Sequence, residues 1–362
     1  MQKWFYNNDE KKIWPFYSFK FLFFIFIFIH HCYNCVKIPF LRQPALAVSG
    51  FIIISGFLTG YIYINKDLKL KESISFSLKR VKKLYPLHLF MLFFVLSNAG
   101  LFNVTSFNVF FELLKRLLCN LFLIQSWIND STYYFSFNGV TWFFSVYLFL
   151  SLITIPIMIE LKKVSNKEKG SFLLVLLSVL IFCFTLLLVF IVRNNHLNEE
   201  FYLYIFPPVR MFEYTLGMIF GILSQKWKKD FKRDGLLFSC LEIISIVVLT
   251  LFVLFNTDIL SFSNLLSSTL NVWILPLLFL LVIFSHQKGL ISKALSFKPI
   301  VYFGEISMYA FLIHQPLITL FTKGESFIHY RYFALYLFIL VLFISSIVNK
   351  YFNYKNDKRD SN

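Results

Sequence analysis

The residues most able to do chemistry near the start of the chain are Lys20, His30 and His31, which bracket a stretch of phenylalanine and isoleucine. Lys20 and His31 are 11 residues apart. In a helix this is about three turns, so both side chains would share one face, roughly 16 Å apart along the axis. An imidazole, with a pKa of about 6.5, can take a proton from a hydroxyl group near neutral pH. The structural alternative is that Lys20 and one histidine only reach the polar surroundings at the two ends of an apolar helix.

This helix must lie in an apolar environment, because the chain is too hydrophobic for one soluble core. Of its 362 residues, 58% are hydrophobic, 15% are charged and 49 are phenylalanine, as in integral membrane proteins. The net charge of +16 does not indicate a nucleic-acid partner, because the lysines and arginines gather between apolar stretches, as in cytoplasmic loops. We therefore expect a multi-pass protein of the cell (plasma or inner) membrane that contacts membrane lipids and no nucleic acid.

Ten apolar stretches are long enough to cross a membrane. They cover residues 14–35, 44–64, 84–102, 139–159, 171–192, 203–223, 236–255, 266–285, 300–321 and 333–351. Lysine and arginine are concentrated after the second, fourth, sixth and eighth stretches and at both termini. The sequence therefore predicts an all-α fold, a polytopic membrane helical bundle of about ten transmembrane helices with both termini cytoplasmic. We expect one transmembrane domain, residues 1–354, and a short cytoplasmic polar tail, residues 355–362.

One further apolar stretch, residues 109–127, does not fit this topology. It carries Glu112, Lys115 and Arg116. Counting it as a span would place the basic loop at 160–170 outside the cell, against the positive-inside rule. An amphipathic or re-entrant helix on the outer side fits the sequence better.

A basic pair stands just before the third stretch. Arg80 and Lys83 are one helical turn apart and would point the same way. By the topology above they lie at the cytoplasmic face, where a phosphate-bearing donor can dock. The alternatives are that they only orient the chain in the membrane or attract anionic lipid.

Polar side chains also occur inside later apolar stretches. Arg210 and Glu213 can neutralise each other across one helical turn, and a purely structural ion pair is the alternative. Ser307 and His314 lie in the ninth stretch, and the depth of His314 matches that of His31. These side chains make the ninth stretch too polar to be only a lipid-facing anchor.

Two other motifs have mainly structural interpretations. Small residues in the second stretch, Ser55, Gly56, Thr59 and Gly60, allow another helix to approach closely. Trp142 opens the fourth stretch, and tryptophan is common at membrane interfaces.

Cys32 and Cys35 form a C-x-x-C motif directly after the two histidines. Together these residues suggest either a metal site or an external disulfide. A second metal-like cluster is missing from the sequence, and most membrane cysteines are small packing residues. We therefore expect no metal.

Taken in order, these segments resemble the acyltransferase family 3 of multi-pass membrane proteins, which O-acetylate cell-surface and exported glycans. The matching motifs are the cation-x10-His helix (Lys20, His31), Ser55-Gly56-Phe57, the basic pair before Tyr85-Pro86 (Arg80, Lys83), Trp142 with Ser145, Pro208-x-Arg210-x-x-Glu213-x-x-x-Gly217, and Gly304-x-x-Ser307-x-x-x-Phe311-Leu312-x-His314-x-Pro316. Each motif is weak alone, whereas six in sequence are specific.

The resemblance implies a role for each candidate residue. His31 is the expected catalytic residue, as general base or as transient acyl carrier, with His30 as the fallback. Acetyl-coenzyme A is the expected acyl donor, held by Lys20, Arg80 and Lys83. The acceptor, a glycan or lipid-linked glycan, is expected to meet Trp142, Arg210, Glu213, Ser307 and His314.

Three features depart from the family pattern. Lys20 and Lys83 stand where arginine is usual, which weakens bidentate phosphate contacts to point-charge contacts. Tyr147 stands where many members have glutamate. The esterase-like domain fused to some members is absent from this sequence, so we expect the membrane domain to complete the transfer.

The sequence thus predicts a membrane O-acyltransferase that moves an acetyl or other short acyl group from cytoplasmic acyl-coenzyme A to a hydroxyl of O-antigen, capsule or exopolysaccharide. The alternative is a multispan polysaccharide transporter or polymerase, which would also be basic inside, aromatic-rich and dotted with buried charge. A signalling or scaffold protein fits poorly with so many intramembrane histidines and charges.

Overall fold

The computed structural model describes residues 4–7, 12–32, 44–98, 106–228, 235–254, 273–322 and 331–360. In these ranges the chain is helical, and its only β-type pairing is an isolated bridge between Phe5 and Phe297. The longer helices are α1 (Trp14–His31), α2 (Pro44–Tyr63), α3 (Ser73–Lys82), α4 (Tyr85–Asn98), α5 (Phe107–Leu121), α7 (Trp142–Ser165), α8 (Gly170–Asn194), α9 (Pro207–Trp227), α10 (Gly235–Leu254), α12 (Ile274–Ser285), α14 (Lys298–Thr322) and α15 (Arg331–Asp360). Short helical elements are η3 (Leu70–Glu72), η4 (Gln125–Trp127), α6 (Ser131–Tyr134), η5 (Gly139–Thr141), η6 (Glu200–Ile205) and α13 (Leu290–Leu295). The prediction of an all-α fold is confirmed.

Six helices in the described residues are long and apolar enough to cross a membrane. They are Trp14–His31, Pro44–Tyr63, Gly139–Ser165, Gly170–Asn194, Gly235–Leu254 and Tyr332–Asn353. The other four predicted spans also contain helices: α4 and α12 are shorter, and α9 and α14 are interrupted by charged and polar side chains. The chain is therefore a membrane protein with several spans, whereas the count of about ten and the cytoplasmic termini stay predictions. Helix α15 continues to Asp360, so the polar tail predicted from residue 355 begins within it.

Helices α2 and α9 pack backbone to backbone at the centre of the bundle. A Cβ on Gly56 would collide with the carbonyl oxygen of Tyr214, and a Cβ on Gly217 would collide with that of Ile53. Gly60 and Gly221 make equivalent approaches one turn further on. The small residues of α2 therefore do what their pattern predicted, which is to admit a second helix.

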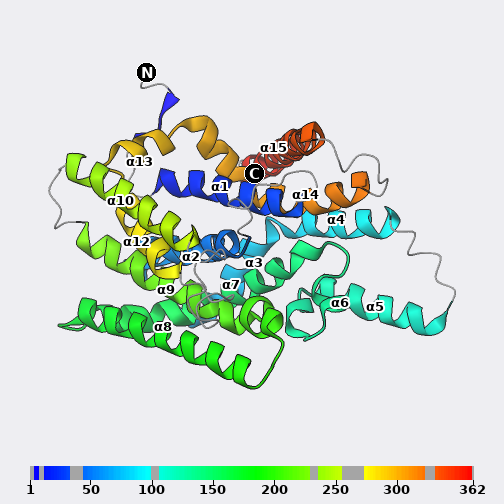
Figure 1. Ribbon diagram of the computed structural model, residues 1–362, viewed down its shortest axis with the longest axis horizontal. Coiled ribbons are helices and arrows are strands. Elements are labelled where there is room, and N and C mark those ends of the chain that lie inside the picture. The colour runs from blue at the N-terminus through cyan, green and yellow to red at the C-terminus, as the bar shows by residue number, and fades with distance from the viewer. Residues whose placement is uncertain are drawn as a thin grey trace.

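Figure 1 shows α1 and α14 lying side by side in the upper half of the view, with α8 along the lower edge of the bundle. The contact between α1 and α14 is close because Gly304 leaves no room for a Cβ against the carbonyl oxygen of Tyr17. Helix α8 exposes a row of large apolar side chains, including Phe172, Leu180 and Leu187. Since the helix is of spanning length, this face suits lipid.

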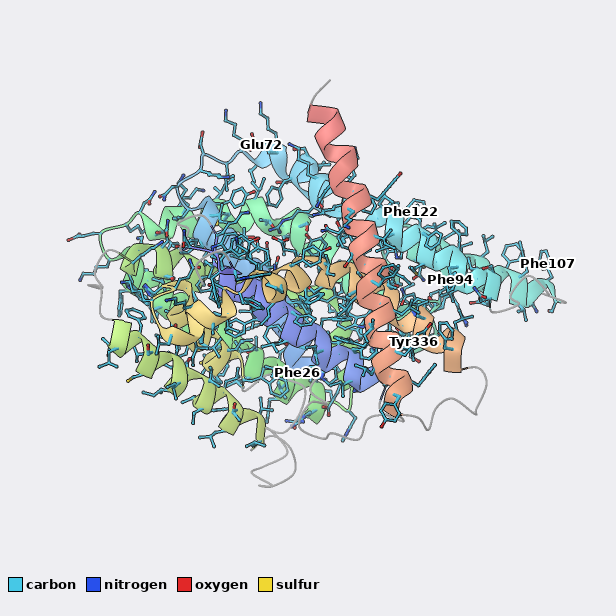
Figure 2. All side chains as sticks on the ribbon, turned by 90° about the horizontal axis from the view of Figure 1, so that it is seen from above. Phe26, Glu72, Phe94, Phe107, Phe122 and Tyr336 are labelled. Atoms are coloured by element: carbon cyan, nitrogen blue, oxygen red, sulfur yellow. The ribbon has the colours of Figure 1, made fainter. Side chains whose placement is uncertain are left out.

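The amphipathic segment predicted at 109–127 forms helix α5 followed by η4. Helix α5 has 15 residues and is not among the spanning candidates. It projects from the body of the molecule, with Phe107 at its far end and Phe122 near the bundle (Figure 2). Its exposed apolar side chains, such as Phe107 and Phe110, coexist with a partly exposed ion pair between Lys115 and Glu112, 2.7 Å apart. An apolar face beside charged side chains is the pattern of an interfacial helix.

Candidate active site

Three imidazoles from α1 and α14 gather at one end of these helices. His30 and His31 form the last turn of α1, and their ring centroids are 5.2 Å apart. The ring of His31 lies 5.1 Å from that of His314. The close packing of α1 on α14 at Gly304 holds the helices in this register. The first and ninth predicted spans are therefore neighbours, which the sequence did not predict.

His314 is fully buried, and its ring orientation is fixed by its own helix. Its Nδ1 lies 2.7 Å from the carbonyl oxygen of Phe311. Because a carbonyl oxygen only accepts, Nδ1 carries the proton and donates it to this bond. In the neutral ring, Nε2 then keeps a lone pair, and it has no hydrogen-bond partner among the described residues. His314 is thus built to accept a proton or a hydrogen bond at Nε2.

Both His30 and His31 line a cavity of about 590 Å³, which we call the outer cavity. Its other walls come from α1, α2, the stretch from the end of α6 to the start of α7, η6 and α14. They are Ile27, Pro44, Ala45, Val48, Phe135, Phe137, Gly139, Val140, Trp142, Glu200, Tyr204, Phe311 and Gln315. The volume lies in the range of about 300–1,000 Å³ that small-molecule sites occupy. A largely apolar wall with a few converging polar groups also matches such sites.

Trp142 and Tyr204 are held in the cavity wall by a buried ion pair. Arg210 Nη1 donates to Glu213 Oε1 at 2.7 Å, and Arg210 Nε donates to the carbonyl oxygen of Tyr204 at 2.7 Å. The guanidinium also lies over the rings of Tyr204 and Trp142, at 4.4 and 5.9 Å from their centroids. Ser49 adds a hydrogen bond of 3.1 Å to Glu213. Neither charged residue lines the outer cavity, so the geometry gives both a positioning role.

A second cavity of about 110 Å³, the inner cavity, lies along the same helices. It is lined by Lys20, Phe51, Ile52, Ser55, Arg80, Leu84, Phe143, Tyr147, Leu150, Tyr214 and Met308. Arg80 is fixed there by two donated hydrogen bonds, from Nη1 to the hydroxyl of Tyr214 at 3.0 Å and from Nη2 to Oγ1 of Thr59 at 2.8 Å. Two cations therefore face the inner cavity, which favours an anionic or strongly polar ligand there.

Five predicted site residues line neither cavity. Of these, His314 lies against His31, and Arg210 and Glu213 support the cavity wall, whereas Lys83 and Ser307 do neither. Lys83 is exposed at the end of α3, with Nζ 5.8 Å from the ring centroid of Tyr309. Ser307 is buried in α14 and donates its hydroxyl to the carbonyl oxygen of Gly304 at 2.8 Å. The structure brings together His30, His31, His314 and Trp142, and separately Lys20 and Arg80, but it leaves these two residues apart from either group.

Sequence reasoning missed the carboxylate of the outer cavity. Glu200 lines it, and its Oε2 accepts a hydrogen bond of 2.8 Å from the hydroxyl of Tyr134. Burial, together with this hydrogen bond, raises the pKa of Tyr134 to about 12, so the phenol keeps its proton. The available signal was an acidic pair, Glu199 and Glu200, in a loop poor in cations directly before the sixth predicted span.

The structure describes one of the two cysteines of the C-x-x-C motif. Cys32 is buried at the end of α1, whereas Cys35 lies outside the described residues. Within the ranges that the structure describes, no group of three or more histidine, cysteine or acidic side chains is arranged to hold a metal ion.

Comparisons with known proteins add an independent line of information. Residues 17–349 match the model of a family described as Acyltransferase domain, Acyl_transf_3. The chain is also similar to acyltransferase MdmB of Streptomyces mycarofaciens, with 25% identity over 186 residues, which cover 49% of this chain and 46% of that protein. The match thus spans less than half the length of this curated relative. No solved structure matches the chain.

Proposed function

Because this chain belongs to the acyltransferase 3 family, we propose that it moves a short acyl group, acetyl first of all, from cytoplasmic acyl-coenzyme A to a hydroxyl of a cell-surface or exported glycan. Family membership confirms the resemblance drawn from the six motifs and the prediction of an acyltransferase. It also favours an acyltransferase over the polysaccharide transporter or polymerase considered from the sequence. The donor, the glycan or lipid-linked glycan acceptor, the residue roles and the cell membrane as location belong to the proposal.

The observation that carries this proposal is the pairing of two cavities along one set of helices. The inner cavity presents the cations Lys20 and Arg80, and the outer cavity presents His30 and His31. Arg80 and Leu84 of the inner cavity belong to the basic segment around α3, which the positive-inside rule assigns to the cytoplasm. The proposed donor site, at the inner cavity, and the proposed acceptor site, at the outer cavity, therefore lie along the same helices.

His31 is the proposed general base. It takes the proton of the acceptor hydroxyl, and the oxygen attacks the carbonyl carbon of the thioester. The ester C–O bond forms as the C–S bond breaks, and the sulfur leaves as coenzyme A thiolate, which takes up a proton. A transient acyl group on His31 is the alternative route. His314, whose Nε2 is free to accept among the described residues, lies beside His31 and shares this proton.

The remaining polar residues bind and orient. Arg80 is fixed by Tyr214 and Thr59, so its charge is pre-organised for the anionic part of the donor. Trp142 and Tyr204 offer ring faces on which a sugar can stack, and Glu200 offers a carboxylate oxygen that accepts hydrogen bonds from sugar hydroxyls. The chain's own residues supply the base, the cations and the acceptor wall, so the proposal needs no metal.

The test joins a donor assay to a product assay. Membranes containing the protein are incubated with radiolabelled acetyl-coenzyme A, and label is counted in the polysaccharide and lipid fractions. Surface polysaccharide from cells with and without the protein is then compared by mass spectrometry for the mass of one acetyl group per modified sugar. Label in the glycan fraction and the matching mass difference support the proposal, and label in neither fraction refutes it.

A further inference from the structure

Four helices line both cavities in succession. Helix α2 gives Pro44, Ala45 and Val48 to the outer cavity and Phe51, Ile52 and Ser55 to the inner one. Helix α1 gives Ile27, His30 and His31 to the outer cavity and Lys20 to the inner one. Helix α7 gives Trp142 to the outer cavity and Phe143, Tyr147 and Leu150 to the inner one. Helix α14 gives Phe311 and Gln315 to the outer cavity and Met308 to the inner one. The two cavities are therefore consecutive sections of the space between α1, α2, α7 and α14.

Three phenylalanine rings stand where one section gives way to the other. Phe51 and Phe143 line the inner cavity, and Phe311 lines the outer one. Their centroids are mutually close: 6.4 Å between Phe51 and Phe143, 6.4 Å between Phe51 and Phe311, and 5.3 Å between Phe143 and Phe311. All three side chains are buried. Since each ring comes from a different helix, together they lie between the cations of the inner section and the imidazoles of the outer one.

We propose that Phe51, Phe143 and Phe311 form an aromatic partition that the acyl thioester crosses to reach His31, and that the bulk of these rings selects the length of the acyl group. This inference rests on the proposed function and adds the residues that determine acyl specificity. The partition is apolar, so it keeps bulk water and ions from passing between the two sections. A short acyl group on a slender thioester arm needs only small rotations of the rings, whereas a longer chain needs space that they occupy.

Phe311 links the partition to the imidazole cluster. Its ring lies 5.8 Å from that of His314, and its carbonyl oxygen accepts the Nδ1–H of the same histidine. An acyl carbonyl that has passed the rings therefore arrives beside His314 and its neighbour His31. Replacing the Phe311 side chain leaves the carbonyl, and hence this hydrogen bond, in place, so partition and base can be tested separately.

The experiment measures acyl-chain preference in membranes that contain the full chain and the cell's own acceptor. Radiolabelled acetyl-, propionyl- and butyryl-coenzyme A are supplied in turn, and label in the glycan fraction is counted. We expect Phe143→Ala and Phe311→Ala to raise the ratio of butyryl to acetyl transfer at least tenfold. We expect Phe143→Trp to lower transfer of all three groups at least tenfold while retaining binding of acetyl-coenzyme A.

The matched control is Phe238→Ala. Phe238 is as buried as the partition rings but lies on α10 and lines neither cavity, so its removal should leave the ratio unchanged. Where an alanine variant does not accumulate in the membrane, Phe143→Leu replaces it, with an intermediate rise expected. An unchanged ratio in accumulated variants, or an equal rise in Phe238→Ala, overturns the partition. Wild-type membranes that transfer no acyl group would instead overturn the proposed function, and the partition with it.

Discussion

The imidazole rings of His31 and His314 lie 5.1 Å apart, although they belong to α1 and α14, which are far apart in the sequence. His314 directs its Nδ1–H to the carbonyl oxygen of Phe311, which leaves Nε2 as the accepting nitrogen of the neutral ring. The ring of His31 contacts both that of His314 and that of His30. This geometry supports the proposal of His31 as the base, which the spacing from Lys20 in the family motif favours over His30.

Replacing His31 tests this assignment. We expect His31→Ala to lower the rate of acyl transfer by about 10²–10⁴-fold, because that is the usual contribution of a general base. His30→Ala, which removes an imidazole from the same cavity, is the matched control and should keep most of the activity. Label transferred from acetyl-coenzyme A is measured at equal amounts of inserted protein. Full activity in His31→Ala would show that another group removes the proton.

Arg80 and Lys83 are expected to differ in their effect on the donor. Arg80 lines the inner cavity and Lys83 does not, although the sequence paired them. Arg80→Ala should raise the KM for acetyl-coenzyme A on the order of tenfold or more, because a hydrogen bond to a charged group contributes about 1.5–3 kcal/mol. Arg80→Lys should recover part of this loss, since a lysine keeps the charge but not the planar fork.

Lys83→Ala is the control for the same kinetic measurement. Its side chain lies at the surface over Tyr309, so the KM should change little. If Lys83→Ala raises the KM as much as Arg80→Ala does, the donor phosphates lie at the surface of α3 rather than at the inner cavity.

The buried ion pair of Arg210 and Glu213 should be important for the stability of the folded protein. Glu213→Gln leaves the guanidinium buried without its counter-charge, which typically costs about 3–5 kcal/mol of unfolding free energy. The double variant Arg210→Met with Glu213→Leu should recover much of this loss, because buried pairs are often replaceable by apolar residues. Thermal unfolding in detergent measures both. A Glu213→Gln variant as stable as the wild type would mean that the pair is not coupled.

The double variant also separates stability from acceptor binding. It removes the bond from Arg210 Nε to the carbonyl oxygen of Tyr204, so the wall formed by Tyr204 and Trp142 loses its support. We expect a stable protein with weaker acceptor binding and an unchanged KM for acetyl-coenzyme A. An unchanged rate at low acceptor concentration would assign Arg210 a structural role alone.

Local patterns predicted the helices well because hydrophobic length and small-residue spacing are properties of single segments. The close approach of α2 and α9 followed from Gly56 and Gly60, and every predicted span contains a helix. The pairing of α1 with α14 did not follow, since a periodic pattern does not encode which helices become neighbours. The partition has the same origin: Phe51, Phe143 and Phe311 are three of 49 phenylalanines, and only packing brings them together.

Polar residues were harder to interpret than apolar ones. Ser307 is a polar residue in an apolar stretch, as a site residue would be. Its hydroxyl, however, donates to a carbonyl oxygen one turn earlier in α14, a common role for serine in helices. Glu200 lines the outer cavity from η6, a short element that a periodic pattern of apolar residues does not predict. In both cases the deciding quantity is the hydrogen-bond partner, which the sequence does not specify.

Glu242, which lines neither cavity, provides a last prediction. It is fully buried on α10, and its carboxylate accepts hydrogen bonds from the backbone N–H groups of Gly289, Ile291 and Ser292, at 3.1, 2.9 and 3.1 Å. The hydroxyl of Ser292 donates to it as well. One side chain thus satisfies N–H groups at the start of α13 that have no partner within that helix, and it ties α13 to α10.

Glu242→Ala leaves these donors buried and unpaired, and each such group costs about 1–3 kcal/mol. We therefore expect a large drop in the thermal midpoint of unfolding. Glu242→Gln should lose less, because its amide oxygen still accepts at this position. Since Glu242 lines neither cavity, the inserted fraction of either variant should transfer acyl groups with an unchanged KM for acetyl-coenzyme A. A raised KM with normal stability would instead connect α13 to the donor site, because the contact between α1 and α13 is the route by which Lys20 could be displaced.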